Sequence, residues 1–159
     1  MELSYRLMNQ TKSKMKKLLL LLLFIPLVSC QDVEVRKTYY DSGELQSIVN
    51  YVDDLRQGEY KEYYESGELQ STVNYVNSAM QGEYKGYYKS GELKRTENYV
   101  DDLKQGEYKY YWESGEIKIR VNYVDGLAQG EYYWYWESGN LKMEGYYVDG
   151  VELSPYEPN

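Results

Sequence analysis

Residues 105–124 read QGEYKYYWESGEIKIRVNYV, and closely related stretches stand 24 residues apart along most of the chain. The dipeptide Ser-Gly recurs with this spacing at residues 42–43, 66–67, 90–91, 114–115 and 138–139. No insertion or deletion interrupts the register. A fixed period of this length indicates an array in which one supersecondary unit stacks on copies of itself.

Each unit predicts a β-hairpin. In the second unit, polar and aromatic residues alternate over 58–64, and residues 65–67 follow as Glu-Ser-Gly. Glycine permits the positive φ of a short hairpin loop, so a turn is expected there. Ser71, Val73 and Tyr75 then share one face of the second strand. We expect a return loop over residues 77–81, after which the next unit begins.

The predicted fold class is all-β, an elongated antiparallel sheet built from five such hairpins. Helix is disfavoured because the apolar period is two and glycine interrupts the pattern at short intervals. Aromatic residues recur in register, at 60, 84, 108 and 132 and at 64, 88, 112 and 136, and are expected to stack as a stripe. The strands are expected at 33–40, 44–52, 57–64, 68–76, 81–88, 92–100, 105–112, 116–124, 129–136 and 140–148.

The N-terminus carries a separate signal. Lys14, Lys16 and Lys17 precede an apolar run over 18–28 that is too short to span a bilayer. The run therefore predicts a cleaved secretory signal peptide over 1–29. Residues 27–30, Leu-Val-Ser-Cys, resemble a bacterial lipobox, and this resemblance implies lipid attachment at Cys30. An ordinary signal peptide with a free cysteine nearby is the alternative.

These features divide the chain into four parts. After the signal peptide, residues 30–38 are expected as an N-terminal linker and first edge strand. The repeats occupy 39–152, as units 39–62, 63–86, 87–110, 111–134 and a degenerate 135–158, and residues 153–159 form a tail. Pro155 and Pro158 in that tail lack the amide hydrogen of a strand ladder and are expected to block edge pairing.

Charge argues against nucleic acid as a partner. The whole chain has a net charge of −8, and loss of residues 1–29 removes five basic residues and one acidic residue, leaving −12. Nucleic-acid binding needs a basic footprint. Adhesion to anionic lipid is disfavoured for the same reason, whereas acyl chains on Cys30 hold a protein to a membrane without basic residues. We therefore expect an exported protein, lipid-anchored in the cell envelope, at the outer membrane or cell surface if the source is a diderm bacterium.

The repeat unit resembles the bacterial MORN-repeat variant family. The fourth unit carries the resemblance best, from Gly106-Glu-Tyr108 through Tyr111-Trp112-Glu-Ser-Gly-Glu-Ile117 to Val124-Asp-Gly126 and Gln129-Gly130. The family is similar to the eukaryotic MORN repeats, and the resemblance implies sheets of hairpins used as membrane-proximal, protein-binding scaffolds. Bacterial members are often labelled antitoxin components, which implies a toxin as one alternative partner.

No catalytic or cofactor site is expected. The chain has no histidine, and Cys30 is its one cysteine, which removes the usual general base, nucleophile pairs and metal ligands. Carboxylates such as Glu59 and Glu68 recur with the period, and we expect every polar residue to be copied with its repeat. Asp53-Asp54 and Asp101-Asp102 lack the spacing of calcium loops and are expected as solvated turns.

Tryptophan departs from the period and marks the candidate binding site. Trp112, Trp134 and Trp136 stand in the last two units, beside Tyr108 and Tyr132. Tyrosine and tryptophan are enriched at binding hot spots and also stack on sugar rings. Three functions stay open: a membrane-anchored protein-binding scaffold, an antitoxin or immunity component, and a glycan-binding envelope protein. A purely structural role for the larger aromatics at the end of the sheet is the alternative.

Overall fold

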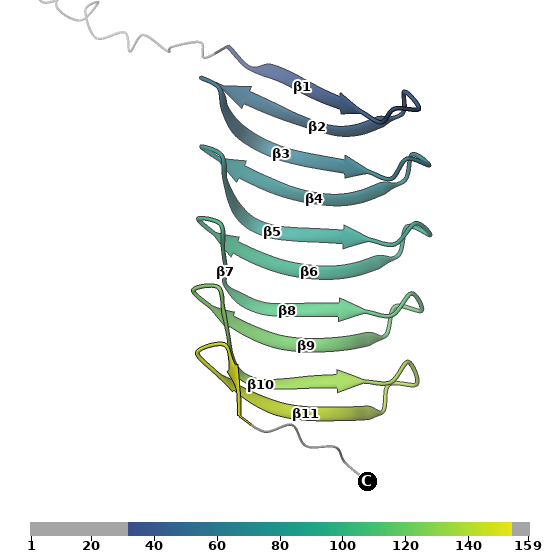
Figure 1. Ribbon diagram of the computed structural model, residues 1–159, viewed down its shortest axis with the longest axis vertical. Helices are drawn as coiled ribbons and strands as arrows, with labels where there is room; N and C mark the ends of the chain where they lie inside the picture. Colours follow the sequence, from purple (N-terminus) through teal and green to yellow (C-terminus); the bar gives the residue numbers. More distant parts are fainter. Residues whose placement is uncertain (1–31, 154–159) are drawn as a thin grey trace, which may run out of the picture. The chain divides into compact units, whose positions relative to one another are not determined.

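A computed structural model describes residues 32–153, and these residues form one open antiparallel sheet, as the sequence predicts (Figure 1). The strands follow one another in chain order across the sheet. Their bounds are β1 Glu34–Tyr39, β2 Leu45–Val52, β3 Leu55–Tyr63, β4 Leu69–Val76, β5 Ala79–Tyr87, β6 Leu93–Val100, β7 Leu103–Lys104, β8 Gly106–Tyr111, β9 Ile117–Val124, β10 Leu127–Tyr135, β11 Leu141–Val148 and β12 Val151–Glu152. Residues 32–153 contain no helix, and so none that could cross a membrane. The expected signal peptide and Cys30 lie outside the described residues.

The strands pair as five hairpins, and a Ser-Gly turn joins the two strands of each hairpin. We number them hairpins 1 to 5, spanning 34–52, 55–76, 79–100, 103–124 and 127–148. In the turn of hairpin 2, the Tyr64 amide donates to the Glu68 carbonyl at 2.8 Å, and the Gly67 amide donates back to the Tyr64 carbonyl at 2.8 Å. Gly67 has φ +98, a conformation that a side chain would strain, which explains why glycine recurs at this position.

The connections between hairpins are two-residue turns, so the return loop expected over 77–81 is wrong. Asn77 and Ser78 both have positive φ, 49° and 69°, and Ala79 already begins β5. Positive φ at both central residues defines the type I′ turn, whose twist matches that of the flanking strands and which favours Asn, Asp and Gly. The same geometry recurs at Asp53-Asp54, Asp101-Asp102, Asp125-Gly126 and Asp149-Gly150.

A bulge at each Gln-Gly pair bends the strand that follows the turn. Between β4 and β5, Asn74 pairs with Gln81 and Thr72 with Lys85, so one residue opposes three. Gly82 in this bulge has φ +79. Extra residues on one strand bend it and increase its twist, and glycine accommodates the positive φ. In hairpin 4 the same interruption, at Gln105, divides the strand into β7 and β8.

The core of this single-layer sheet lies on one face, which we call the inner face. Val49, Val73 and Val121 are buried there at equivalent positions. Ser71 and Tyr75 are buried beside Val73, as the predicted strand face requires. The expected aromatic stripe packs on these residues, with ring pairs Tyr60–Tyr75, Tyr84–Tyr99, Tyr108–Tyr123 and Tyr132–Tyr147 at centroid distances of 6.0, 6.4, 6.1 and 5.0 Å. Edge-to-face aromatic pairs add about 0.5–1.5 kcal/mol each beyond burial.

Two ladders of hydrogen bonds join neighbouring hairpins at the two sides of the sheet. At the Ser-Gly side, an aromatic donor reaches the last carbonyl before the next turn. Its members are Tyr40 Oη to Tyr63 O (2.7 Å), Tyr64 Oη to Tyr87 O (2.7 Å), Tyr88 Oη to Tyr111 O (2.6 Å) and Trp112 Nε1 to Tyr135 O (3.3 Å). We call this series the aromatic ladder.

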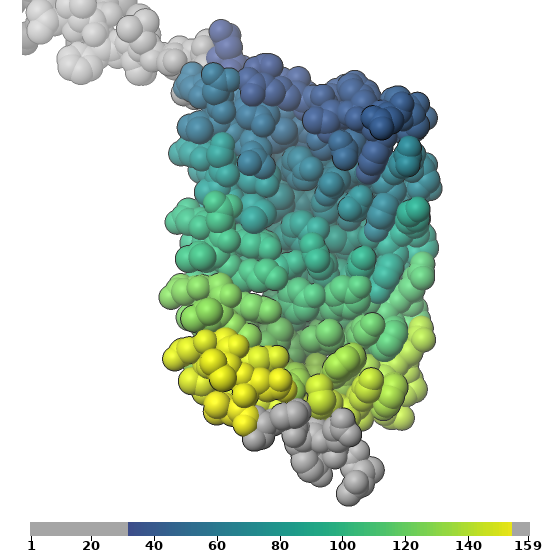
Figure 2. Space-filling view, viewed as in Figure 1, coloured from purple at the N-terminus to yellow at the C-terminus, as the bar shows by residue number. Residues whose placement is uncertain are grey.

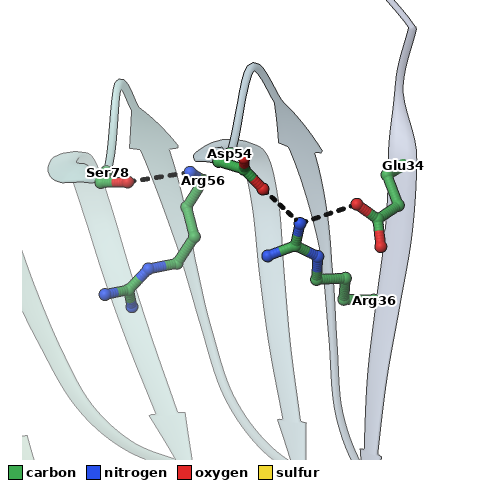
Figure 3. A network of polar contacts seen from close by, with 5 residues as sticks. All are labelled: Glu34, Arg36, Asp54, Arg56 and Ser78. Atoms are coloured by element: carbon green, nitrogen blue, oxygen red, sulfur yellow. Dashed lines mark hydrogen bonds and ion pairs between the residues drawn. The ribbon is translucent and has the colours of Figure 1, made fainter.

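On the opposite side, each two-residue turn donates to the preceding hairpin. The amides of Ser78, Asp102, Gly126 and Gly150 donate to the carbonyls of Arg56, Met80, Lys104 and Ala128. Figure 3 shows the side-chain part of this ladder, in which the Ser78 hydroxyl accepts the Arg56 amide at 2.9 Å. At the first hairpin the donor is the Arg36 guanidinium, which binds the carboxylate of Asp54, one period before Ser78, at 2.6 Å (Figure 3). Each hairpin therefore contacts its sequence neighbours, as the ordered colour bands of Figure 2 show.

A candidate binding depression over hairpins 3 to 5

The inner face is hollowed over its C-terminal half. A depression of about 730 Å³ is lined by side chains of hairpins 3, 4 and 5. Its walls combine aliphatic, aromatic and charged groups, chiefly Arg95, Lys104, Tyr108, Val121, Tyr132 and Trp134. Its volume lies within the ~300–1,000 Å³ typical of ligand pockets.

The structure places three of the five predicted aromatic residues in this depression. Tyr108, Tyr132 and Trp134 line it. Trp112 and Trp136 occupy the turn positions of the aromatic ladder instead. Trp112 donates its indole N–H to Tyr135 O, whereas Trp136 stands at the end of the series and is 51% exposed.

Trp134 is unusual within the depression. Its Nε1 atom is buried and has no hydrogen-bond acceptor among residues 32–153. The Lys142 ammonium lies 4.4 Å from the centroid of its ring, within cation–π range. A buried donor without a partner costs about 1–3 kcal/mol, so this tryptophan is not placed for stability alone.

A buried carboxylate holds the two cationic side chains that line the depression at the hairpin 3 side. The Glu97 side chain is 3% exposed and stands where Val49, Val73 and Val121 stand in other hairpins. Arg95 Nε lies 3.0 Å from one carboxylate oxygen, and Lys104 Nζ lies 2.7 Å from the other. The Tyr99 hydroxyl donates to the same carboxylate at 3.0 Å. The expectation that every polar residue is copied with its repeat is therefore wrong at this site.

A glycine makes room for the arginine of this cluster. Gly86 pairs with Arg95 across the hairpin, and a Cβ atom at Gly86 would lie 3.2 Å from Arg95 Cγ. The equivalent positions hold Glu62, Tyr110 and Trp134, all of them larger. Arg95 extends over this gap and donates to the Tyr84 hydroxyl at 2.9 Å.

The cluster leaves one excess positive charge at the hairpin 3 side of the depression, while the Glu152 carboxylate of β12 also lines it. Arg95 and Lys104 are 39% and 33% exposed, while their shared partner Glu97 is buried. Burial, and then the Glu97 charge, raises the pKa of Tyr108 to about 12. The same two causes raise the pKa of Tyr99. Both phenols are thus neutral near pH 7, and the cluster carries a net charge of one positive unit in a strongly acidic protein.

The far wall of the depression is closed by Tyr132. Its ring lies over Gly145, where a Cβ atom would come within 2.5 Å of Tyr132 Cε1. The Tyr132 hydroxyl donates to Glu152 of β12. Burial, followed by this carboxylate, raises the pKa of Tyr132. Gly145 stands where Val49, Val73 and Val121 stand, and its missing side chain leaves room for the Tyr132 ring.

Arg95, Glu97 and Lys104 are not among the residues that the sequence predicts for the site. Their signal is the same as that of the tryptophans, a departure from the period. One period earlier, Ser71, Val73 and Met80 stand at the positions of these three residues. A column-by-column comparison of the units would identify the cluster.

The two ladders and the single inner face define a β-hairpin repeat protein. A comparison with protein families matches the MORN repeat variant at residues 35–53, 56–77, 80–101, 104–125 and 128–149. The chain belongs to the MORN repeat variant family. The matched units coincide with the five hairpins.

Comparison with curated proteins gives no match. Among solved structures, the chain is similar to the GtfA/B complex bound to UDP and GlcNAc, with 16% identity, 74% of this chain and 24% of the other covered, and a TM-score of 0.30. It is also similar to accessory secretory protein 1,2 and 3 in Streptococcus pneumoniae, with 12% identity, 70% and 20% covered, and a TM-score of 0.38. The chain spans about a quarter or less of the length of these structures.

Proposed function

We propose that this MORN repeat protein is a non-enzymatic, membrane-anchored scaffold that holds a protein partner in the depression over hairpins 3 to 5. The observation that carries the proposal is the gathering of period-breaking residues around one hollow. Arg95 and Trp134 stand where hairpin 2 has Ser71 and Glu62, Lys104 stands one period after Met80, and all three line the depression. A sheet of identical hairpins needs none of these changes for its own stability.

The charge and shape of the depression describe the partner. At the hairpin 3 side, Arg95 and Lys104 together exceed the charge of Glu97, whereas Glu152 lines the depression at its hairpin 5 side. Ile119, Val121 and Met143 provide apolar surface. A partner segment that places an acidic side chain beside an aliphatic or aromatic one would match both. The paired hairpins hold the walls in fixed register, so little ordering of the site is needed on binding.

Anchoring rests on the sequence before the sheet. The basic residues and apolar run over 14–28 and the Leu-Val-Ser-Cys at 27–30 support lipid attachment at Cys30. Few residues separate Cys30 from Glu34, the start of β1, so the hairpin array would lie close to the membrane surface. Cys30→Ser is expected to release the protein from the membrane fraction, and a mutant that stays anchored would refute this part.

The binding test uses the repeats as a source of conservative replacements. The triple variant Arg95→Ser, Glu97→Val and Lys104→Met copies residues 71, 73 and 80, which stand one period earlier, into β6 and β7. The variant keeps the repeat pattern and removes the charged cluster. Arg56→Met is the matched control, because it makes the same type of change at the equivalent position outside the depression.

The experiment is a cross-linked pull-down from membranes with the tagged wild-type protein, the triple variant and the control. We expect the same partner with the wild type and the control, and at least tenfold less with the triple variant. Equal recovery by all three would overturn the proposed site. Because the triple variant and the control each carry one net positive charge less than the wild type, the comparison is made at about 0.15 M salt, where the Debye length is about 8 Å.

Two other classes of partner, a glycan and a toxin, are tested by separate experiments. A change in tryptophan fluorescence on titration with cell-wall fragments would assign the aromatic surface to a glycan instead. An antitoxin or immunity role is the same scaffold with an exported toxin as the partner. Co-purification with the product of an adjacent toxin gene, lost in the triple variant, would support that role.

A further inference from the structure

The two ends of the sheet carry complementary parts of one repeat strand. At the C-terminal end, β12 pairs Val151 with Val148 and Glu152 with Tyr147. The Leu153 amide then donates to Tyr146 O at 2.9 Å, as Gln105 donates to Asn98 O at 2.8 Å between hairpins 3 and 4. Residues 151–153 therefore occupy the positions of 55–57, the start of β3, in the register that joins one hairpin to the next.

At the N-terminal end, β1 supplies the remainder of the same strand. Glu34–Tyr39 lies one period before residues 58–63. Among residues 32–153, β1 pairs with β2 on one side and with no strand on the other. Residues 151–153 and 34–39 together thus correspond to residues 55–63, the whole of β3.

We propose that two copies of this protein associate head to tail, with β1 of one copy continuing β12 of the other along the open edge of β11. The inference is independent of the partner proposed for the depression. A second copy is the occupant we infer, because among residues 32–153 each end of the sheet carries the part of this strand that the other end does not. Repetition of the contact would extend the repeat array without changing its register.

The break between the two copies falls at a position where the ladder is already interrupted. Between β2 and β3, the paired residues are Asn50 with Gln57 and Ile48 with Lys61. Gly58, in the bulge between them, is the position equivalent to Glu34, the first residue of β1. A chain discontinuity there costs no strand-to-strand pair that an intact repeat makes.

The side chains that would meet at the junction between copies are complementary in charge. Lys61 faces Ile48 across the β2–β3 pair, and the equivalent residues at the junction are Lys37 and Glu144. Opposite charges directly across a strand pair contribute about 0.2–1 kcal/mol. Lys37 is exposed, and no strand among residues 32–153 lies beside it on the open edge of β1. The charges on β1 block unspecific edge pairing, while this one register joins unlike charges.

The aromatic ladder points to the same contact. Tyr40, Tyr64, Tyr88 and Trp112 donate to the carbonyls of residues 63, 87, 111 and 135. One period earlier, the corresponding carbonyl belongs to Tyr39, at the end of β1. One period later, the corresponding donor is the indole of Trp136, which is 51% exposed and has no acceptor among residues 32–153. In the head-to-tail pair, Trp136 of one copy would donate to Tyr39 of the next.

The test is charge reversal across the junction, measured by sedimentation equilibrium of the purified full-length protein. A mild detergent shields the proposed N-terminal membrane anchor. The variants are Lys37→Glu, Glu144→Lys and the two combined. Lys37 and Glu144 lie in different hairpins at opposite ends of the sheet, so one cannot compensate for the other within a chain. Lys61→Glu is the control, because it changes the charge at the equivalent position inside the array.

We expect the mass of the wild type and of Lys61→Glu to rise with concentration. Each junction single variant should associate at least fivefold more weakly, and the double variant should recover to within about twofold of the wild type. Circular dichroism at low concentration checks that each variant is folded. A wild type that stays monomeric up to about 1 mM, unchanged association in the single variants, or a double variant without recovery would each overturn the proposal.

Discussion

Trp112 donates its indole N–H to the carbonyl oxygen of Tyr135 at 3.3 Å, where three preceding hairpins use a tyrosine hydroxyl for the same bond. The donor changes and the acceptor position does not. A tryptophan that is singular in the sequence can therefore serve a periodic structural role. Trp134, two residues before Trp136, breaks the period in a different way, because its indole nitrogen is buried without an acceptor among residues 32–153.

Replacement of Trp112 should distinguish the contribution of its indole N–H to stability from that of its aromatic ring. Trp112→Phe keeps an aromatic ring and leaves Tyr135 O without its donor, so we expect a loss of about 1 kcal/mol in the free energy of unfolding. Trp112→Tyr restores the donor used in hairpins 1 to 3 and should cost less. Urea unfolding measures both. If the two variants are equally stable, the hydrogen bond is not what selects this position.

Removal of the whole charged cluster should leave the fold stable, whereas removal of its two cations alone should destabilise it. Arg95→Ser with Lys104→Met leaves Glu97 buried and uncompensated, which is expected to cost about 3–5 kcal/mol. Addition of Glu97→Val replaces the cluster with the residues that stand one period earlier, and we expect stability equal to the wild type or higher. Denaturant unfolding of the double and triple variants checks this. A triple variant less stable than the double would show that the cluster supports the fold.

Gly145 should tolerate no side chain while Tyr132 lies over it. Gly145→Ala places a Cβ atom within 2.5 Å of the Tyr132 ring, so we expect a destabilisation of about 1–3 kcal/mol. Combination with Tyr132→Ala removes the clash. The measured cost of the double variant should therefore be smaller than the sum of the two single costs. Additive costs would contradict the contact.

Alkaline pH should weaken the fold through its half-buried phenols. The pKa of Tyr108 and of Tyr88 is raised to about 12, against an ordinary value of 10.0. Between these values the unfolded chain loses phenolic protons that the folded chain keeps, so stability falls as pH rises from about 10 to about 12 and is unaffected by these groups below about pH 9. Tyr108→Phe should reduce this slope. Urea midpoints at about pH 9 and pH 11 for both proteins provide the comparison.

Much of the fold can be read from the repeat unit. The Ser-Gly hairpins, the antiparallel sheet, and the inward face of Ser71, Val73 and Tyr75 are confirmed. The return connection differs from the prediction because residues 77–81 include no aromatic or β-branched residue that would indicate a strand. Asn77 and Ser78 alone satisfy the positive φ of a type I′ turn, so the strand resumes two residues later.

The site is harder to predict because the repeat pattern is defined by the residues that recur, whereas the charged cluster consists of residues that do not. Ring chemistry identifies Tyr108, Tyr132 and Trp134, and these residues line one depression. The sequence does not single out Glu97, since a carboxylate in a strand of a highly charged chain is normally solvated. Its burial depends on Arg95 from its own strand and on Lys104 from β7, a combination that needs the register between hairpins 3 and 4.

We propose that residues departing from the 24-residue period form the binding site. Hydrogen–deuterium exchange of the protein with and without its recovered partner locates the site without any substitution. We expect protection on binding to be confined to hairpins 3 to 5, chiefly residues 93–108 and 127–147. Protection centred on hairpins 1 and 2, where the inner face holds the regular residues, would contradict it.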